Sequence, residues 1–176
     1  MKTIFQNSRF PWHAIALAIL LIAGSAPQSP AGAQKTGKVT GLEIPRFVSL
    51  RSGKVNLRTG PGTRYPVEWV LTYRNMPVEV LDEFDTWRKI RDWQGSTGWV
   101  HRSLLSGKRW VIVPDNQILL RRDPRPNAGV IARIAKKNIG RLETCRGIWC
   151  RAAFSGFDGW IKRAEIWGVY KDETFK

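Results

Sequence analysis

The sequence contains little cysteine, little histidine and few acidic side chains. Its two cysteines are too few for a disulfide-rich scaffold or a four-ligand zinc site. The longest apolar run, residues 14–24, falls well short of the ~20 residues that a membrane-spanning helix needs. A chain of 176 residues with these absences is neither a multi-span membrane protein nor a large cofactor enzyme.

What is present points to a folded, basic protein. The 29 Lys and Arg residues outnumber the 14 Asp and Glu residues, which gives a formal net charge of +15. A hydrophobic content of 43%, with nine tryptophans, excludes a wholly disordered chain, because so much apolar surface can offset the entropy lost on ordering.

The N-terminus predicts a secretory signal peptide in residues 1–33. Lys2 and Arg9 form a positive start without any acid, residues 14–24 form the apolar core, and AGA at 31–33 places small residues at the −3 and −1 positions. Cleavage after Ala33 would make the protein exported, periplasmic or extracellular, with no stable membrane insertion. A buried helix of a globular domain is the alternative interpretation of the apolar run.

Export decides how the charge is interpreted. Removal of residues 1–33 leaves 27 basic and 14 acidic residues, a net charge of +13. In the cytoplasm such a basic, tryptophan-rich chain would indicate a nucleic-acid binder, an alternative that requires an uncleaved N-terminus; for an exported protein no nucleic-acid partner is expected. Envelope polyanions, such as the carboxylates of peptidoglycan stems, are the available partners. That the charge only keeps the protein soluble is the other interpretation.

From residue 46 onward one motif occurs twice, about 60 residues apart. VNLR at 55–58 returns as ILLR at 118–121, 63 positions later, and the offset then falls to 62 and 61, consistent with shortened turns. Such self-similarity predicts two copies of one small domain. The order is kept by Pro61 with Pro124, Leu71 with Ile134, Asn75 with Asn138, Trp87 with Trp149, and GWV at 98–100 with GWI at 159–161.

Each copy has the pattern of short strands. Residues 78–81, 87–91 and 98–101 are β-branched and aromatic and are separated by turn residues. The segment RTGPGTR at 58–64 interrupts them, because its proline has no amide to donate and Gly60 and Gly62 are free to take positive φ. About five short strands in about 60 residues predict a small, strongly bent barrel. The expected fold class is therefore all-β, with two tandem small barrels.

The first copy resembles a bacterial SH3 (SH3b) domain. The resemblance is carried by VNLRTGPGTRYP at 55–66, PVEV at 77–80, WRKI at 87–90 and GWVHRSLL at 98–105. The chain is similar to the exported subgroup with two such domains in tandem. The second copy departs from the pattern, since RRDPRP at 121–126 stands where the first has RTGPGT.

The resemblance implies two SH3-like barrels and a non-catalytic binding module of the bacterial envelope. The implied ligand is peptidoglycan or another cell-wall peptide; the alternative is a structural module that binds another envelope protein or a peptide. The expected organisation is a signal peptide (1–33), a flexible leader (34–45), a first SH3b-like domain (46–107), a connection (108–114), a degenerate second domain (115–171) and a tail (172–176).

Cys145 and Cys150 flank the predicted hairpin turn of the second copy. A symmetric hairpin brings them face to face across the strands, within the Cα separation that a disulfide needs. In an oxidising compartment the pair should be oxidised. A redox-active pair is the alternative, but the spacing is C-x4-C rather than C-x-x-C. We expect a structural disulfide.

The residues for catalysis are missing. His101 is the only histidine after residue 33, and no free thiol is expected to accompany it. Asp82, Glu83 and Asp85 gather in one predicted turn, whereas a glycosidase needs two carboxylates facing each other across a cleft. We therefore assign no catalytic residue, no metal site and no cofactor.

Aromatic and basic side chains are the candidates for ligand binding. By their place after the hairpin turn, Trp87 and Trp149 resemble the exposed groove tryptophan of eukaryotic SH3 domains. Trp99 and Trp160, inside the GW strands, are expected in the core. Packing is the alternative role for each of these aromatics. The candidate ligand-binding residues are Trp87, Tyr65, Tyr73, Arg58, Arg64 and Trp149, a set that suits an acidic or carboxylate-bearing ligand.

Overall fold

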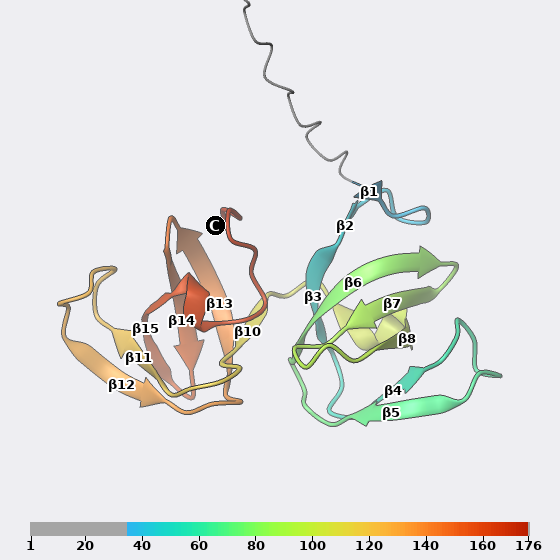
Figure 1. Cartoon of the computed structure of the whole chain (residues 1–176), viewed down its shortest axis with the longest axis horizontal. Helices are drawn as coiled ribbons and strands as arrows, with labels where there is room; N and C mark the ends of the chain where they lie inside the picture. The colour runs from blue at the N-terminus through green and yellow to red at the C-terminus, as the bar shows by residue number, and fades with distance from the viewer. Residues whose placement is uncertain (1–34, 176) are drawn as a thin grey trace, which may run out of the picture. The chain divides into compact units, whose positions relative to one another are not determined.

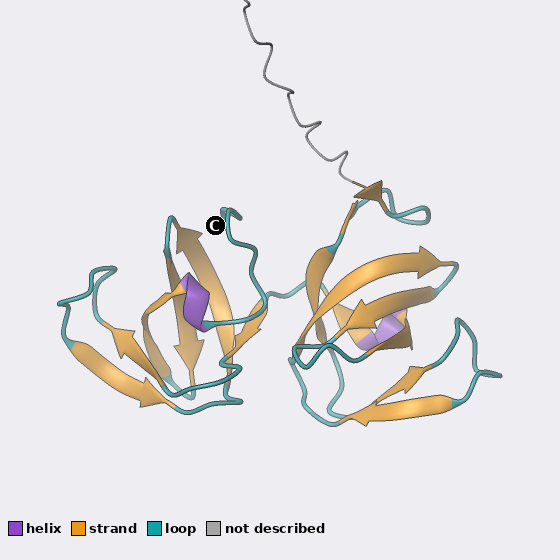
Figure 2. Cartoon of the chain, viewed as in Figure 1, coloured by secondary structure: helices purple, strands orange, loops and turns teal. Residues whose placement is uncertain are grey.

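The computed structural model describes residues 35–175, and Figure 2 shows that they are almost entirely strands and loops with two short helical turns. The expected signal peptide lies outside the described residues. The first sheet, in the order β5-β4-β8-β7-β6-β3-β9, consists of β3 (Arg46–Leu50), β4 (Val55–Arg58), β5 (Val67–Leu71), β6 (Pro77–Phe84), β7 (Trp87–Arg91), β8 (Thr97–His101) and β9 (Leu105–Ser106). A 3₁₀ helix, η1 (Arg102–Leu104), joins β8 to β9.

The second sheet has the order β10-β13-β14-β15-β11-β12. It consists of β10 (Trp110–Ile112), β11 (Ile118–Arg121), β12 (Val130–Ile134), β13 (Ile139–Arg146), β14 (Trp149–Phe154) and β15 (Phe157–Lys162), followed by the 3₁₀ helix η2 (Arg163–Glu165). Figure 1 shows both groups of strands strongly curved. Among the described residues no helix is long and apolar enough to cross a membrane.

The two sheets repeat one topology. Where β9 pairs with β3 in the first, Trp167 bridges Ile112 of β10 in the second. Both sheets change register at equivalent places, once within β6 and β13 and once at the end of β4 and β11. Such bulges bend a strand and increase its twist, which lets a short sheet close on itself. The predicted all-β fold with two tandem barrels is confirmed.

Each barrel closes around its own core, which follows from period-two alternation along the strands. In β4, Val55 and Leu57 are fully buried while the residues beside them face outward. The first core consists of Ile44, Leu50, Val55, Leu57, Met76, Val78, Val80, Ile90 and Val100. The second consists of Val111, Val113, Ile118, Leu120, Ile134, Leu142, Cys145, Cys150, Ala152, Phe154, Ile161 and Ile166.

The alternation also corrects an expectation about the GW tryptophans. In β8, Gly98 and Val100 point inward and are buried, so Trp99 between them lies on the opposite face and is partly exposed. Trp160 has the same position in β15. The expectation that both tryptophans belong to the core was wrong.

Residues 34–45, expected to be a flexible leader, instead include a hairpin. β1 (Lys35–Thr36) pairs with β2 (Glu43–Ile44). The turn is held by the Glu83 carboxylate, which accepts hydrogen bonds from the amides of Val39 (3.1 Å) and Thr40 (2.9 Å) and from the Thr40 hydroxyl (2.7 Å). Composition alone indicated flexibility because the anchoring carboxylate is more than 40 residues away.

The boundaries of the second copy also differ from expectation. β10 lies inside residues 108–114, which were expected to form a connection, and it pairs with β13. The tail contacts the second sheet too, since the Cys145 amide donates to the Phe175 carbonyl at 2.8 Å. Only 107–109 separate the strands of the two sheets.

The repeat alignment needs one shift. Asn75 has positive φ (63°) and donates its amide to the Leu50 carbonyl. The residue that does the same in the second copy is Lys137, with φ of 66° and a hydrogen bond to Val113. Asn138, which the sequence pairs with Asn75, is therefore one position late, because the offset falls to 62 before this turn.

One cross-strand position is stabilised differently in the two copies. In the first, Glu83 pairs with Arg88 across β6 and β7, and their side chains are buried and form an ion pair at 3.5 Å. In the second, the equivalent pair across β13 and β14 is Cys145 and Cys150, which form a disulfide. The predicted disulfide is confirmed. It stands at the cross-strand position where the first copy has the buried Glu83–Arg88 salt bridge.

Side chains near the C-terminus also contact the first sheet. The ring of Phe47 packs edge-on against Trp167, with centroids 4.9 Å apart, and in a tilted arrangement against Tyr170, with centroids 4.6 Å apart. The Tyr170 hydroxyl donates to the buried Glu79 at 2.9 Å. Burial is the main cause that raises the pKa of Tyr170, and the hydrogen bond to Glu79 is the second. The phenol therefore stays protonated and remains a donor.

Candidate functional site

A groove around Trp87 is the candidate ligand site of the first copy. Its volume is about 350 Å³. We call it the Trp87 groove, and it is lined by Lys54, Asn56, Arg58, Thr63, Trp87, His101 and Leu104. None of these lining residues is acidic, and the groove is therefore basic and aromatic.

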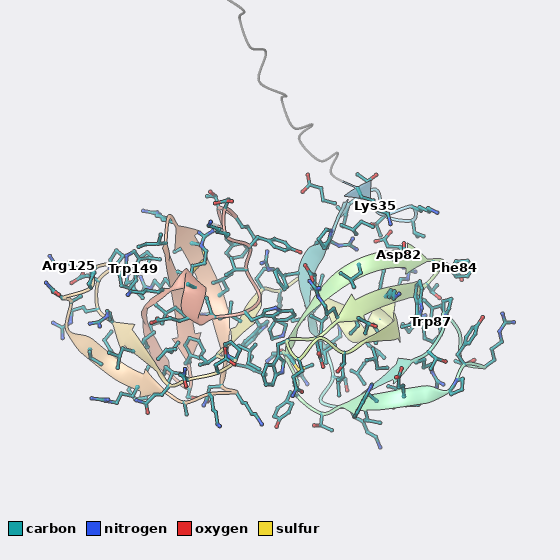
Figure 3. All side chains as sticks on the ribbon, viewed as in Figure 1. Lys35, Asp82, Phe84, Trp87, Arg125 and Trp149 are labelled. Atoms are coloured by element: carbon teal, nitrogen blue, oxygen red, sulfur yellow. A yellow bond between two sulfur atoms is a disulfide. The ribbon has the colours of Figure 1, made fainter. Side chains whose placement is uncertain are left out.

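Trp87 stands at the end of a hairpin. It is the first residue of β7 and pairs with Phe84 across the turn, where Figure 3 shows both side chains at the end of the β6–β7 hairpin. On its other side it pairs with His101 of β8, and the two rings meet edge to face at 5.6 Å. Two cross-strand neighbours thus fix the indole, while one part of it remains exposed.

His101 is held by the 3₁₀ helix that follows it. Its Nδ1 lies 2.7 Å from the Ser103 hydroxyl and also accepts from the Ser103 amide at 3.3 Å. The imidazole is therefore oriented as the cap of η1 and presents its ring to Trp87.

Arg58 lines the groove but also shapes the loop beside it. Its Nη1 donates to the carbonyls of Thr63 (3.1 Å) and Tyr65 (2.7 Å), which draws the GPG loop back toward β4. Arg121 does the same in the second copy, where Nη1 donates to Ala128 at 2.9 Å. Because both copies keep this contact, Arg58 has a structural role whether or not it also meets a ligand.

The loop between β4 and β5 closes over Tyr65. A Cβ on Gly60 would lie 2.4 Å from the Tyr65 ring. Neither Gly60 nor Gly62 has positive φ, so the expected reason for these glycines was wrong and close approach of the ring replaces it. Arg64 extends from the same loop and stacks on Tyr65 at 5.2 Å. Neither Tyr65 nor Arg64 lines the Trp87 groove.

Tyr73 belongs to a different groove. It is exposed and lines a recess of about 360 Å³ together with Trp69, Trp93 and Asp92. The carboxylate of Asp92 is occupied there, accepting from the amides of Gln94 and Ser96 at 2.9 Å.

Trp149 differs from Trp87 although the two are equivalent in sequence. Trp149 is only 8% exposed, whereas Trp87 is partly exposed. Lys162 is its cross-strand neighbour, in the place of His101. Of the six candidates, Trp87 and Arg58 thus share one groove, Tyr65 and Arg64 form its neighbouring loop, and Tyr73 and Trp149 lie elsewhere.

Lys54 and Asn56 were missed as candidates. They precede Arg58 at intervals of two, and the intervening Val55 and Leu57 are fully buried. Alternation of that kind puts Asn56 and Arg58 on the outer face of β4, with Lys54 directly before the strand on the same side. Reading the period of KVNLR at 54–58 would have identified them.

Comparisons with known proteins place the chain in a family. The bacterial SH3 domain family model matches twice in tandem, at residues 51–107 and 115–168. A search of curated proteins found no match.

Among solved structures, similar chains include NlpC2 from Trichomonas vaginalis (12% identity, TM-score 0.34, 73% of this chain and 50% of that one) and NlpC1 from the same organism (12%, 0.33, 70% and 45%). A third is an NlpC/P60 family protein from Bacillus cereus (13%, 0.32, 68% and 55%). The chain spans about half the length of these structures. With the family model matching most of both sheets, the chain belongs to the bacterial SH3 domain family.

Proposed function

We propose that this protein is an exported, non-catalytic binding protein of the bacterial envelope, whose first copy recognises a cell-wall peptide through the Trp87 groove. Bacterial SH3 domains are typically non-catalytic modules that bind cell-wall components. The single observation that carries the proposal is the partly exposed Trp87 in a groove that also holds Lys54 and Arg58. An aromatic platform beside cations suits a peptide that bears carboxylates.

Two further observations support export. The Cys145–Cys150 disulfide is the kind of bond that persists outside a reducing cytosol. Residues 1–33 have the sequence pattern of a signal peptide, cleavage of which would release the protein into the periplasm or the medium.

The test is co-sedimentation of the protein with purified cell-wall sacculi across a salt series. Specific contacts keep the protein bound at high salt, whereas simple attraction of a basic protein to an anionic polymer disappears by roughly 0.15–0.3 M salt, where the Debye length falls below about 8 Å. Loss of binding in that range would contradict specific recognition.

Trp87→Ala is the informative variant and Trp69→Ala its matched control. Trp69 is 56% exposed on β5 and does not line the Trp87 groove. Trp87→Ala should weaken binding about thirtyfold, the effect of about 2 kcal/mol at a binding hot spot, with an unchanged melting temperature. If Trp87→Ala unfolds the protein instead, the tryptophan is a packing residue and the site is wrongly assigned.

A protein–protein module is the second candidate function. β5 is the outermost strand of the first sheet and leaves Val67, Trp69 and Val70 exposed. An exposed strand edge is a template for pairing with an extended segment of another protein. This function would be favoured if the protein co-purified with one discrete envelope protein, and if Trp69→Ala but not Trp87→Ala abolished the association.

A further inference from the structure

The second copy has a recess that the first copy lacks the side chains to form. Its volume is about 530 Å³. We call it the Ile148 recess, and it is lined by Ile148, Lys162, Arg163, Ala164, Ile166, Val169 and Lys171. None of these residues belongs to the Trp87 groove.

Arg163 builds one wall of the recess. Its amide donates to the Ile148 carbonyl at 2.9 Å, which ties η2 to the β13–β14 turn. Its Nη1 donates to the carbonyls of Tyr170 and Lys171, so the guanidinium holds the C-terminal segment against η2. Val169 and Lys171 come to line the recess through this segment.

The basic side chains at the recess form no ion pair with a carboxylate among the described residues, although the charge of Glu173 is felt at Arg163. Arg163 is 8% exposed, forms no ion pair within residues 35–175, and its buried Nε has no hydrogen-bond partner there. Lys162 and Lys171 are exposed and form no ion pair in the same part of the chain. A buried cation projects its field farther than an exposed one, because the protein interior screens charge weakly.

Two of the nearby carboxylates already have partners, and the third, Asp172 next to Lys171, is exposed to solvent. Glu165 accepts the Lys162 amide at 3.3 Å, and Glu173 pairs with Arg109. Neither lines the recess, and no acidic side chain does among the described residues. The positive potential of three basic residues is therefore open to a ligand.

The rest of the lining is apolar. Ile148 is 68% exposed, the highest exposure of any large hydrophobic residue described, and it lies beside Ala164, Ile166 and Val169. In the first copy Thr86, Arg102 and Ser103 stand at the positions of Ile148, Arg163 and Ala164, and Arg102 is exposed. The apolar floor and the buried cation are thus both present in the second copy and both absent from the first.

We propose that the Ile148 recess binds the C-terminal end of a peptide, with an apolar side chain in the recess and the free carboxylate at Lys162 and Lys171. The combination of apolar floor and unpaired cations selects a ligand in which an apolar group adjoins an anion. Ile148, Ala164 and Lys171 are exposed, so the recess is not the closed channel that a long acyl chain would need. The proposal uses no residue of the Trp87 groove and stands independently of it.

The test is a titration followed by amide chemical shifts in NMR. N-acetyl-leucine carries the proposed chemistry, and N-acetyl-leucinamide has the same apolar group without the charge. N-acetyl-leucine should shift the backbone amide signals of residues 148 and 162–171 saturably. N-acetyl-leucinamide should bind roughly tenfold more weakly, as expected for loss of hydrogen bonds to a charged group. The Lys162→Gln/Lys171→Gln double variant should lose this preference, whereas Lys136→Gln, an exposed lysine outside the recess, should keep it.

Three results would overturn the proposal: equal binding of acid and amide, no saturable shift at the recess, or decanoate binding there more tightly than the peptide mimic. The last result would reassign the recess to an acyl chain. Failure of this test leaves binding of sacculi at the Trp87 groove unaffected, and Trp87→Ala should leave the titration unchanged, so the two proposals fail separately.

Discussion

Replacing Glu83 by glutamine removes the carboxylate that joins the N-terminal hairpin to the first barrel. Its side chain is fully buried and accepts from Val39, Thr40 and Arg46, with Arg88 alongside. Burial alone raises the pKa of Glu83, but the hydrogen bonds from Thr40, Arg46 and Val39 outweigh it and lower the pKa to about 2. A carboxyl whose pKa falls from 4.5 to about 2 on folding contributes about 3 kcal/mol at neutral pH.

The unpaired charge that the substitution leaves behind has a cost of the same size. Removing one partner of a buried ion pair costs about 3–5 kcal/mol, since the other charge stays buried and unpaired. Arg88, 3% exposed, is that charge. Glu83→Gln should therefore lower the free energy of unfolding by about 3 kcal/mol at pH 7, measured by urea denaturation with tryptophan fluorescence.

The matched control is Glu143→Gln. Glu143 pairs with Arg141 and Arg151 on the surface of the second sheet, where both arginines are about half exposed. Exposed pairs contribute at most about 1 kcal/mol, so this variant should cost much less. Equal costs for the two variants would refute the central role of Glu83.

The pH dependence adds a second check. The folded-state pKa of Glu83 lies below its unfolded value, so the stabilisation is complete above pH 4.5 and is lost as the pH falls toward about 2. The difference between wild type and Glu83→Gln should shrink to less than half, from about 3 kcal/mol at pH 7 to about 1 kcal/mol at pH 3. A difference that stays constant over this range would show that the carboxylate charge is not the cause.

Three other perturbations test the repeat directly. The double variant Glu83→Cys/Arg88→Cys should form a disulfide in air, because the equivalent cross-strand pair in the other copy is the native disulfide. The measurement is the loss of titratable thiols; thiols that stay free would show that the two hairpins differ. Trp149→Ala should destabilise by about 3–5 kcal/mol in thermal unfolding, as removal of a buried indole does; a loss below 1 kcal/mol would contradict its burial. Gly60→Ala should cost about 1–3 kcal/mol by overpacking against the tyrosine ring, and Gly62→Ala less, since its added Cβ would lie 3.4 Å from that ring; equal costs would rule out ring contact as the reason.

The repeat shows what local pattern predicts well. Strand spacing, turn residues and the matched motifs predict two barrels, because alternation and turn chemistry are properties of neighbouring residues. The disulfide follows for the same reason, since Cys145 and Cys150 lie five positions apart in one hairpin.

The candidate site was only partly predictable. Trp87 and Arg58 do line one groove, but Trp149, its counterpart in sequence, is buried. The residues around the two tryptophans also differ, since Lys162 pairs with Trp149 where His101 pairs with Trp87. A match of one residue between two repeats does not tell which residues pack around it.

The sequence by itself determined the number of barrels, the strands of the central hairpins and the disulfide, all of which depend on residues close together in the chain. Only the tertiary structure decided that Glu83 anchors the segment near Thr40 and that the C-terminal segment lies against Arg163 to form the Ile148 recess. The Glu83 anchor joins residues more than 40 positions apart, and the recess depends on how the last residues return to the barrel. Neither arrangement leaves a periodic pattern in the sequence, because each depends on where a buried charged group finds its hydrogen-bond partners in the folded chain.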